Sequence, residues 1–272
     1  MTDLDRHRQK FPHIDHYSYF NYGGQGLLPT SALEAMHQAQ LTSQQIGPFS
    51  NQSGLQLYKT TEHLKRTFAQ ALGCNSTDLA LTENTTLGCN IVLWGLGWRS
   101  SDHILLTDCE HQGLVAIAQE LAARFDLTVD LCSVIDNPDP LGAIAQAITP
   151  RTRILVLSHI LWNQGQVLPL EAIVALCHSK GVQVLVDGAQ SVGVLPLDLD
   201  AIDADYYAFT GHKWWCGPPG LGALHINPKM NCAVRSSAGA ASCSTTEVSP
   251  RPFIKMGGAT RFPPPPGRCI RV

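Results

Sequence analysis

Short apolar runs alternate with amphipathic stretches along most of this chain, and this alternation limits the folds open to it. Apolar runs typical of strands occupy 78–82, 103–107, 127–134, 153–158, 181–187, 206–210 and 221–226. Stretches with helical spacing of apolar residues fall between them, at 84–94, 114–124, 141–148 and 170–180. Strands that alternate with helices in this way predict a mostly parallel sheet between helices. We therefore expect an α/β fold.

Two more helices are expected before the first strand, at 32–45 and 55–72. Ser31 is predicted to cap the first of these helices, with Glu34 completing a capping box. The aromatic residues of 17–22 are predicted to form a short strand that runs into glycines. Residues 1–16 are polar and are predicted to form an arm outside the sheet.

Composition narrows the class of protein. The chain has 272 residues, 44% of them hydrophobic, which is enough for a sizeable core. A formal net charge of −3 argues against nucleic-acid binding. No run of about 18 apolar residues is present, so we expect no membrane partner and a cytoplasmic location. The nine cysteines are scattered without a Cys-x-x-Cys pair, which favours neither a metal site nor a disulfide framework.

The segment 206–217 carries the strongest chemical signal. An apolar run ends at Gly211, and Lys213 then emerges next to Trp214 and Trp215. Apolar surroundings remove water from an amine and lower its pKa, which is what a lysine that forms a Schiff base needs. A lone lysine after a strand is more often a solvated surface residue. The two glycines of the segment, which let backbone approach a ligand, favour the functional interpretation here.

A carboxylate ends the strand predicted upstream. Asp187 closes the apolar run 181–187, and ligands of α/β sheets bind beyond the carboxyl ends of strands. Asp187 and Lys213 are therefore expected to open onto one crevice. Such a pair suits pyridoxal 5'-phosphate (PLP), because the lysine forms the imine and the acid keeps the pyridinium nitrogen protonated. The alternative for Asp187 is a plain helix cap.

Asp187 and Gln190, together with the sequence Thr210-Gly211-His212-Lys213, resemble the class V aminotransferase family of PLP-dependent enzymes. That family includes cysteine desulfurases and cysteine/cystine C–S lyases. The segment 158–165 and the Trp-rich lysine turn are most similar to the lyase branch. The resemblance covers about 15–228 and implies a PLP fold type I large domain with a mainly parallel seven-stranded sheet.

The resemblance also implies a role for each candidate residue. Lys213 would carry the Schiff base and remove the substrate's Cα proton, Asp187 would hold the pyridine nitrogen, and His111 would stack on the ring and shuttle protons. The phosphate would be bound by Thr85, Thr86, Thr210 and His212, the phenolic oxygen by Asn163 and Gln190, and the substrate by Asn21, Gly23 and Trp162. Threonines at a helix start are also ordinary caps, but free N–H groups there favour an anion.

The function implied by the resemblance is β-elimination from cysteine or cystine, so the expected partner is a small-molecule amino acid substrate. A cysteine desulfurase, a true aminotransferase and a non-catalytic PLP-fold remnant are the alternatives. In the family, the desulfurase cysteine and the arginine that grips the substrate carboxylate lie on a C-terminal part that this sequence does not match.

The expected domain boundaries follow from where the alternation of predicted strands and helices stops. We expect an arm at 1–16, a PLP-binding large domain at 17–230 and an aberrant, poorly ordered tail at 231–272 with the sequence Pro263-Pro264-Pro265-Pro266. The C-terminal small domain of the family is expected to be missing or incomplete. Intact family members are homodimers, and a damaged C-terminal half would weaken that assembly.

Overall fold

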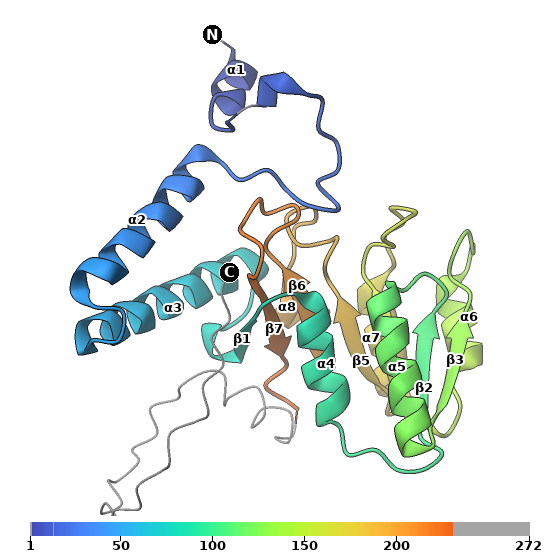
Figure 1. The fold of residues 1–272 in the computed structure, drawn as a ribbon. Coiled ribbons are helices and arrows are strands. Elements are labelled where there is room, and N and C mark those ends of the chain that lie inside the picture. Colours follow the sequence, from blue (N-terminus) through green and yellow to red (C-terminus); the bar gives the residue numbers. More distant parts are fainter. Residues whose placement is uncertain (1, 13, 231–272) are drawn as a thin grey trace, which may run out of the picture. The chain divides into compact units, whose positions relative to one another are not determined.

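A seven-stranded sheet is at the centre of the computed structural model, which describes residues 2–12 and 14–230 (Figure 1). Its strands are β1 (Leu79–Thr82), β2 (His103–Thr107), β3 (Thr128–Cys132), β4 (Thr152–Ser158), β5 (Gln183–Asp187), β6 (Tyr206–Thr210) and β7 (Gly222–Ile226). They lie in the order β1-β7-β6-β5-β4-β2-β3. The pairs of β7 with β1 and with β6 are antiparallel, and the other pairs of neighbouring strands are parallel. The predicted α/β class and mainly parallel sheet are confirmed.

Helices cover both faces of this sheet (Figure 1). On one face, α4 (Thr85–Gly95) and α5 (Gln112–Phe125) pack Val92, Leu93 and Leu121 against strand residues. On the other face lie α3 (Asn51–Leu72), α6 (Pro140–Ala147), α7 (Leu170–Ser179) and the short α8 (Leu199–Ile202). Strands buried on both faces need apolar residues at every position, which explains the continuous apolar runs of the sequence.

The parallel strands end at one edge of the sheet, and this edge carries polar residues. Ser158 at the end of β4 pairs in register with Asp187 at the end of β5. Asp187 in turn pairs with Ala208 of β6, two residues before Thr210. Helix α4 packs closely on β6, since a Cβ on Gly88 would lie 2.9 Å from the Cβ of Ala208. This close approach brings the N-terminus of α4 to the same edge.

The N-terminal part of the chain differs from two expectations. The segment 17–22 pairs with no strand; Tyr17, Tyr19 and Tyr22 instead form a chain of ring contacts. The capping box at Ser31 is also wrong. Helix α2 (Thr30–Ile46) has Pro29 at its N-cap without a side-chain hydrogen bond, so Ser31 already lies inside the first turn. The arm contains α1 (Asp3–Arg8), capped by Thr2, and η1 (Ile14–His16).

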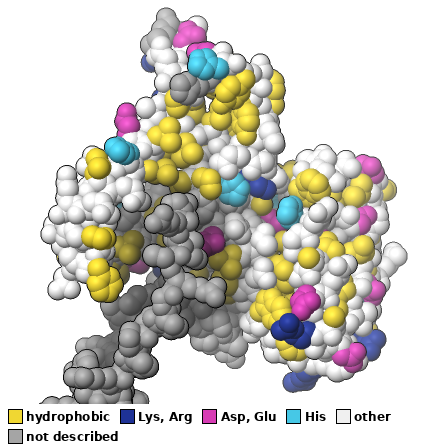
Figure 2. Space-filling model, viewed as in Figure 1, with side chains coloured by type: hydrophobic (Ala, Val, Ile, Leu, Met, Phe, Trp, Pro, Cys, Tyr) yellow, Lys and Arg dark blue, Asp and Glu magenta, His cyan; other side chains and the backbone are white. Residues whose placement is uncertain are grey.

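Helix α2 buries none of its side chains. Hydrophobic residues therefore remain at the surface, as the yellow side chains in Figure 2 show, and those of α2 include Leu33, Met36 and Leu41. Among the described residues, no helix combines the length and the apolar character needed to cross a membrane. The described residues belong to one unit, Met1–Ser242. A second unit, Cys243–Val272, and the predicted tail at 231–272 lie outside the described residues.

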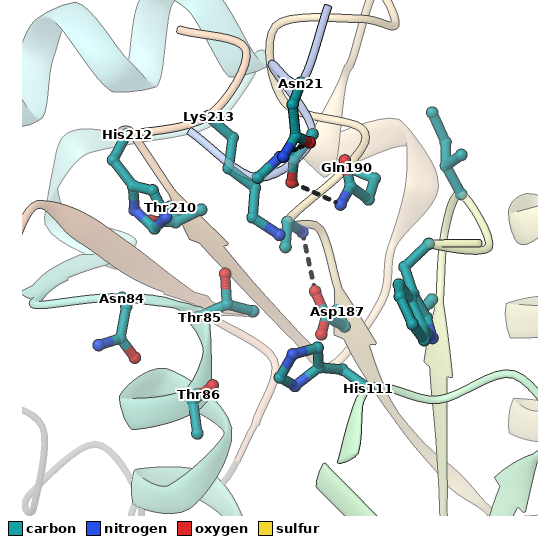
Figure 3. A pocket seen from close by; sticks show the side chains of 16 residues that line it. Asn21, Asn84, Thr85, Thr86, His111, Asp187, Gln190, Thr210, His212 and Lys213 are labelled. Carbon is teal, nitrogen blue, oxygen red and sulfur yellow. Dashed lines mark hydrogen bonds between the residues drawn. The ribbon is translucent and has the colours of Figure 1, made fainter. Parts of the chain in front are cut away.

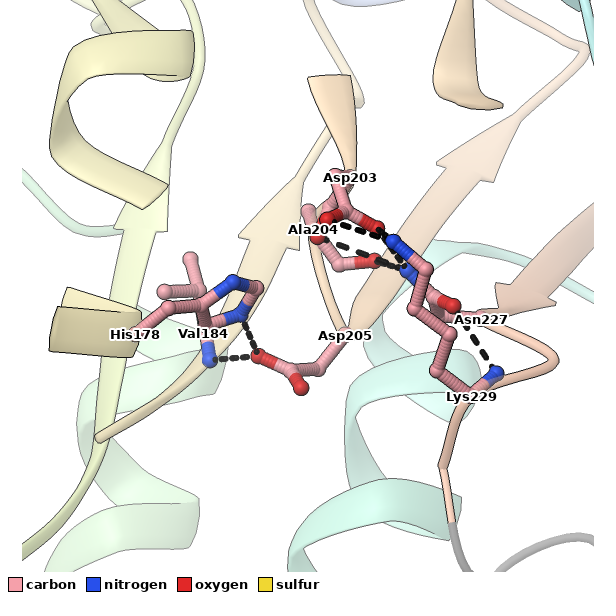
Figure 4. A network of polar contacts seen from close by, with 7 residues as sticks. All are labelled: His178, Val184, Asp203, Ala204, Asp205, Asn227 and Lys229. Atoms are coloured by element: carbon pink, nitrogen blue, oxygen red, sulfur yellow. Dashed lines mark hydrogen bonds and ion pairs between the residues drawn. The ribbon is translucent and has the colours of Figure 1, made fainter. Parts of the chain in front are cut away.

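A polar network fixes the opposite edge of the sheet, where β5 and β6 begin (Figure 4). Asp205 accepts hydrogen bonds from the backbone N–H of Val184 at 2.7 Å and from Nε2 of His178 at 3.0 Å. Asn227, just after β7, donates to Oδ1 of Asp203 at 2.7 Å. These bonds tie the ends of β5, β6 and β7 together and hold the central strand in register.

Candidate active site

A cavity of about 630 Å³ opens at the carboxyl edge of the sheet (Figure 3). All predicted site residues except Asn163 line it. The full lining is Asn21, Gly23, Gly24, Asn84, Thr85, Thr86, His111, Ser158, Ile160, Trp162, Asp187, Ala189, Gln190, Thr210, His212 and Lys213. Segments far apart in the sequence thus meet at one cavity, as the βαβ pattern predicts.

Asp187 is buried at the end of the central strand, with 6% of its surface exposed. Burial raises the pKa of its carboxyl, against the opposing effects of a 2.8 Å hydrogen bond from the backbone N–H of Ala189 and of Lys213 and His111. A buried carboxylate is costly unless partners of opposite charge or hydrogen-bond donors face it. The site supplies such partners and leaves the carboxylate facing the cavity (Figure 3).

Lys213 extends from the loop after β6 into the cavity (Figure 3). Loss of hydration lowers the pKa of its amine, while the charge of Asp187 acts in the opposite direction. Desolvation is the larger effect, so the amine is easier to deprotonate than an exposed lysine. The preceding His212 accepts or donates a 2.5 Å hydrogen bond between its Nδ1 and the hydroxyl of Thr210, which orders the loop.

The hydroxyl of Thr85 is the clearest indication of an anion site. It is buried at the first turn of α4 and has no hydrogen-bond partner among the described residues. Asn84 caps the helix by accepting from the N–H of Leu87 at 2.9 Å. Other N–H groups of the first turn remain available, and a helix N-terminus favours an anion. Buried hydroxyls are rarely left without a partner, so this one fits a bound anionic group.

The cavity fits PLP, which the resemblance implies, at both of its ends. Thr85 and Thr86 give hydroxyls, and α4 gives N–H groups, where a phosphate needs donors. Thr210 lines the cavity as well, but its hydroxyl is already bonded to Nδ1 of His212. Asp187 gives a buried carboxylate where a pyridinium nitrogen needs an acceptor. Within the part of the chain that the structure describes, no cluster of side chains suits a metal ion.

His111 and Trp162 form another wall of the cavity. The two rings meet edge to face, with centroids 6.1 Å apart and an interplanar angle of 72°. Nδ1 of His111 accepts a hydrogen bond from the N–H of Gly113 at 3.1 Å and so caps α5. A neutral imidazole in this position therefore carries its proton on Nε2. The capping role and the role in the cavity are compatible, because they use different parts of the ring.

Asn163 follows Trp162 directly, but its side chain contacts Cys109. Its Oδ1 accepts from Sγ of Cys109 at 2.7 Å, and the residue does not line the cavity. Asn84, Ser158 and Ala189 line the cavity although the sequence did not single them out as site residues. Each of them ends a strand or follows one closely, and this position was the signal available to find them.

Glu110 is a buried carboxyl behind the cavity that sequence reasoning did not assign. Burial raises its pKa to about 7, against hydrogen bonds from Thr107 and from Ser158. Both the N–H and the hydroxyl of Ser158 donate to it at 2.9 Å. Glu110 therefore links the loop that carries His111 to the end of β4, and it shapes the wall between them.

Cysteine thiols packed in the core are weakly acidic for the same reason. Burial raises the pKa of Cys74, Cys132 and Cys177 to about 12, and the pKa of Cys89 is raised as well. No described cysteine lines the cavity.

Comparison with known sequences gives one family. Residues 18–249 match the family described as aminotransferase class-V. Isopenicillin N epimerase of Streptomyces clavuligerus is 32% identical over 214 residues, which are 76% of this chain and 53% of the epimerase. A cysteine desulfurase of Shigella sonnei is 35% identical over 159 residues, which are 56% of this chain and 38% of the desulfurase.

Solved structures agree with this assignment. A lysine-to-alanine mutant of C-DES with glycine covalently linked to its PLP cofactor has a TM-score of 0.79 and 46% identity over 81% of this chain. A complex of the cystine C–S lyase C-DES with cysteine persulfide has a TM-score of 0.78 and the same 46% identity over 80%. The chain covers 59% of each of these two structures, so it spans less than two thirds of its relatives.

The raised pKa of Glu110 predicts how stability depends on pH. Its folded pKa of about 7 lies above its ordinary value of 4.5, so the folded state binds the extra proton in that window. Stability from this group is therefore present below about pH 4.5 and is lost as pH rises to about 7. Glu110→Gln keeps the size of the side chain and the acceptor for Ser158 but does not titrate.

Urea unfolding at several pH values checks this prediction. Between pH 5 and pH 8, the wild type should lose stability relative to Glu110→Gln by on the order of 1–3 kcal/mol. Glu120→Gln, an exposed carboxyl on α5, is the matched control and should follow the wild type. A constant difference between Glu110→Gln and the wild type at all pH values would contradict the prediction.

Proposed function

The chain belongs to the aminotransferase class-V family, and we propose that it is the cofactor-binding part of a PLP-dependent enzyme that cleaves the C–S bond of cysteine or cystine. One observation carries the proposal: a single cavity joins Lys213, the buried Asp187 and the unpartnered hydroxyl of Thr85. The 46% identity to a cystine C–S lyase supports the choice of substrate. Because the chain spans only part of its relatives, activity and substrate are proposed here for the whole enzyme.

PLP, when bound, supplies an electron sink that stabilises negative charge at the substrate's Cα. Asp187 would support this with a buried carboxylate that faces the cavity, where its negative charge favours a protonated pyridine nitrogen. Thr85, Thr86 and the first turn of α4 would hold the phosphate and so fix the orientation of the cofactor.

Lys213 has two proposed tasks. Its desolvated amine would hold the cofactor in the cavity, and as a free base it would accept the Cα proton of the substrate. Loss of that proton would allow the Cβ–S bond to break, with the bonding electrons leaving on sulfur. The lowered pKa of Lys213 suits both tasks, because each needs a neutral amine.

His111 and Trp162 are proposed to enclose the reacting groups. His111 would cover the face of the cofactor ring, and its Nε2–H side, left free by the cap on α5, could pass a proton at the cavity. Trp162 is 46% exposed at the rim of the cavity, where Asn21 and Gly23 also lie, and would contact the substrate.

A cysteine desulfurase is the second candidate, supported by the identity of 35% to the Shigella sonnei enzyme. A desulfurase needs a cysteine nucleophile at the substrate, and the described part of the cavity contains none. The described lining also holds no arginine for a substrate carboxylate. A non-catalytic remnant that binds PLP without turnover is the third candidate, and experiment separates the three.

Covalent attachment tests the role of Lys213. Borohydride reduction of the PLP-loaded protein, followed by peptide mass spectrometry, should place the cofactor on the peptide that contains Lys213. Lys213→Ala should lose this label and the visible absorption of the bound cofactor. Lys59→Ala, an exposed lysine on α3, is the control and should keep both. Label on another lysine in the wild type would show that Lys213 is not the anchor.

Product analysis tests the reaction. Incubation with cystine should yield pyruvate, ammonia and cysteine persulfide, because β-elimination removes the sulfur and leaves a product that hydrolyses to pyruvate. Asp187→Asn should slow turnover on the order of 10²-fold or more, as loss of one preorganised electrostatic group does. Alanine in place of pyruvate would favour the desulfurase, and PLP binding without any product would favour the remnant.

A further inference from the structure

Trp214 does not line the cavity, yet it touches two residues at its rim. Its indole Nε1–H donates a 2.7 Å hydrogen bond to Oε1 of Gln190. Its ring stacks on Tyr22, with centroids 6.2 Å apart and an interplanar angle of 21°. The side chain is 38% exposed, so burial alone does not account for its position.

The other end of Gln190 is also engaged. Its Nε2 donates to the backbone carbonyl of Gly23 at 3.0 Å. An indole N–H can only donate and a carbonyl can only accept, so the two contacts demand the same orientation of the amide. One N–H of Gln190 is then left over, on the side chain that lines the cavity between Asn21 and Asp187 (Figure 3).

The N-terminal segment 19–26 packs tightly against residues 211–217, the loop after β6 that carries Lys213, called the lysine loop below. The N–H of Gly26 donates to the carbonyl of His212 at 2.7 Å. A Cβ on Gly26 would lie 2.0 Å from the carbonyl oxygen of Lys213, so no larger residue fits there without displacement. The segment also closes on itself, since the hydroxyl of Tyr19 donates to the carbonyl of Gln25 at 2.6 Å. It forms one wall of the cavity through Asn21, Gly23 and Gly24.

We propose that Trp214 is a positioning residue that holds the segment 19–26 against the lysine loop and turns the N–H end of Gln190 toward the bound cofactor. The proposal rests on the proposed function, because it gives Gln190 a contact with PLP. A donor beside the phenolic oxygen of the cofactor stabilises the deprotonated form of the bound cofactor. Without the indole N–H, only the bond from Nε2 to the carbonyl of Gly23 opposes a turn of the amide oxygen of Gln190 toward the cavity.

Trp214→Phe removes the N–H donor and keeps an aromatic ring against Tyr22. Trp94→Phe is the matched control, because Trp94 is 40% exposed and contacts Phe125 and Arg124 on the surface of α4 and α5. Gln190→Glu is the second variant. Its side chain has the same shape, but an ionised carboxylate cannot donate to Gly23 or to the cofactor.

The first readout uses the protein without cofactor. Limited proteolysis, followed by peptide mapping, measures how often the segment 19–26 opens. Loss of one hydrogen bond should raise the cleavage rate within this segment roughly 2- to 13-fold in Trp214→Phe. Gln190→Glu should show a similar increase, and Trp94→Phe should match the wild type.

The second readout uses the PLP-loaded protein. The midpoint of the pH titration of its visible absorption should rise by roughly 0.4–1.1 pH units in Trp214→Phe. It should rise in Gln190→Glu as well and stay unchanged in Trp94→Phe. A merely structural role for Trp214 would lower the thermal midpoint of unfolding and leave this titration unchanged.

An unchanged titration midpoint in Trp214→Phe would contradict the proposal that Trp214 orients Gln190. An unchanged cleavage rate would contradict the proposal that Trp214 holds the segment 19–26. If the wild type binds no PLP, the proposed function fails. The cleavage rates still decide whether Trp214 holds the segment in that case, so the two failures are distinguishable.

Discussion

The burial of Asp187 is the constraint on which the rest of this site depends. The carboxylate ends β5, the middle strand of the sheet, and the residue is 6% exposed although it lines the cavity. A charge in such a place is retained only if donors and cations surround it. The backbone N–H of Ala189, the amine of Lys213 and His111 meet this need, and each comes from a different loop at the same edge. The geometry of parallel strands thus brings the chemistry together, since their carboxyl ends share one edge.

Burial at this edge of the sheet shifts the pKa of the amine and the pKa values of the acids in opposite directions. Desolvation lowers the pKa of Lys213, and raises that of Asp187 and that of Glu110, so neither the amine nor the acids behave as surface groups. The hydroxyl of Thr85 and the N–H groups in the first turn of α4 are uncharged hydrogen-bond donors. Such donors suit an anionic phosphate, because they bind it without transferring a proton to it. A site with a desolvated amine, a buried acid and an anion site matches the needs of a PLP enzyme better than those of a simple binding protein.

Much of this was readable from the sequence, because burial on both faces of the sheet leaves long apolar runs and their polar ends mark the site. Asp187 and Lys213 were found by this rule, and the sheet was predicted correctly. The strand at 17–22 was wrong, because its aromatic residues serve ring contacts instead of strand pairing. The cap at Ser31 was wrong because Pro29 starts the helix earlier. The side chain of Asn163 contacts Cys109, and that of Trp214 contacts Gln190. Both contacts depend on the direction of a side chain in a loop, and the spacing of apolar residues in the sequence carries no information on that direction.

The hydroxyl of Thr85 offers the most direct test of the central claim that this edge is built for a phosphorylated cofactor. Thr85→Val removes an unpartnered buried hydroxyl and keeps the shape of the side chain. The cofactor-free variant should therefore be as stable as the wild type or more stable in urea unfolding. Its affinity for PLP, measured by calorimetric titration, should fall roughly 13- to 160-fold, as loss of a hydrogen bond to a charged group does, while its weaker affinity for pyridoxal, which lacks the phosphate, should not change. A variant that is less stable without cofactor and binds PLP as tightly as the wild type would contradict the account.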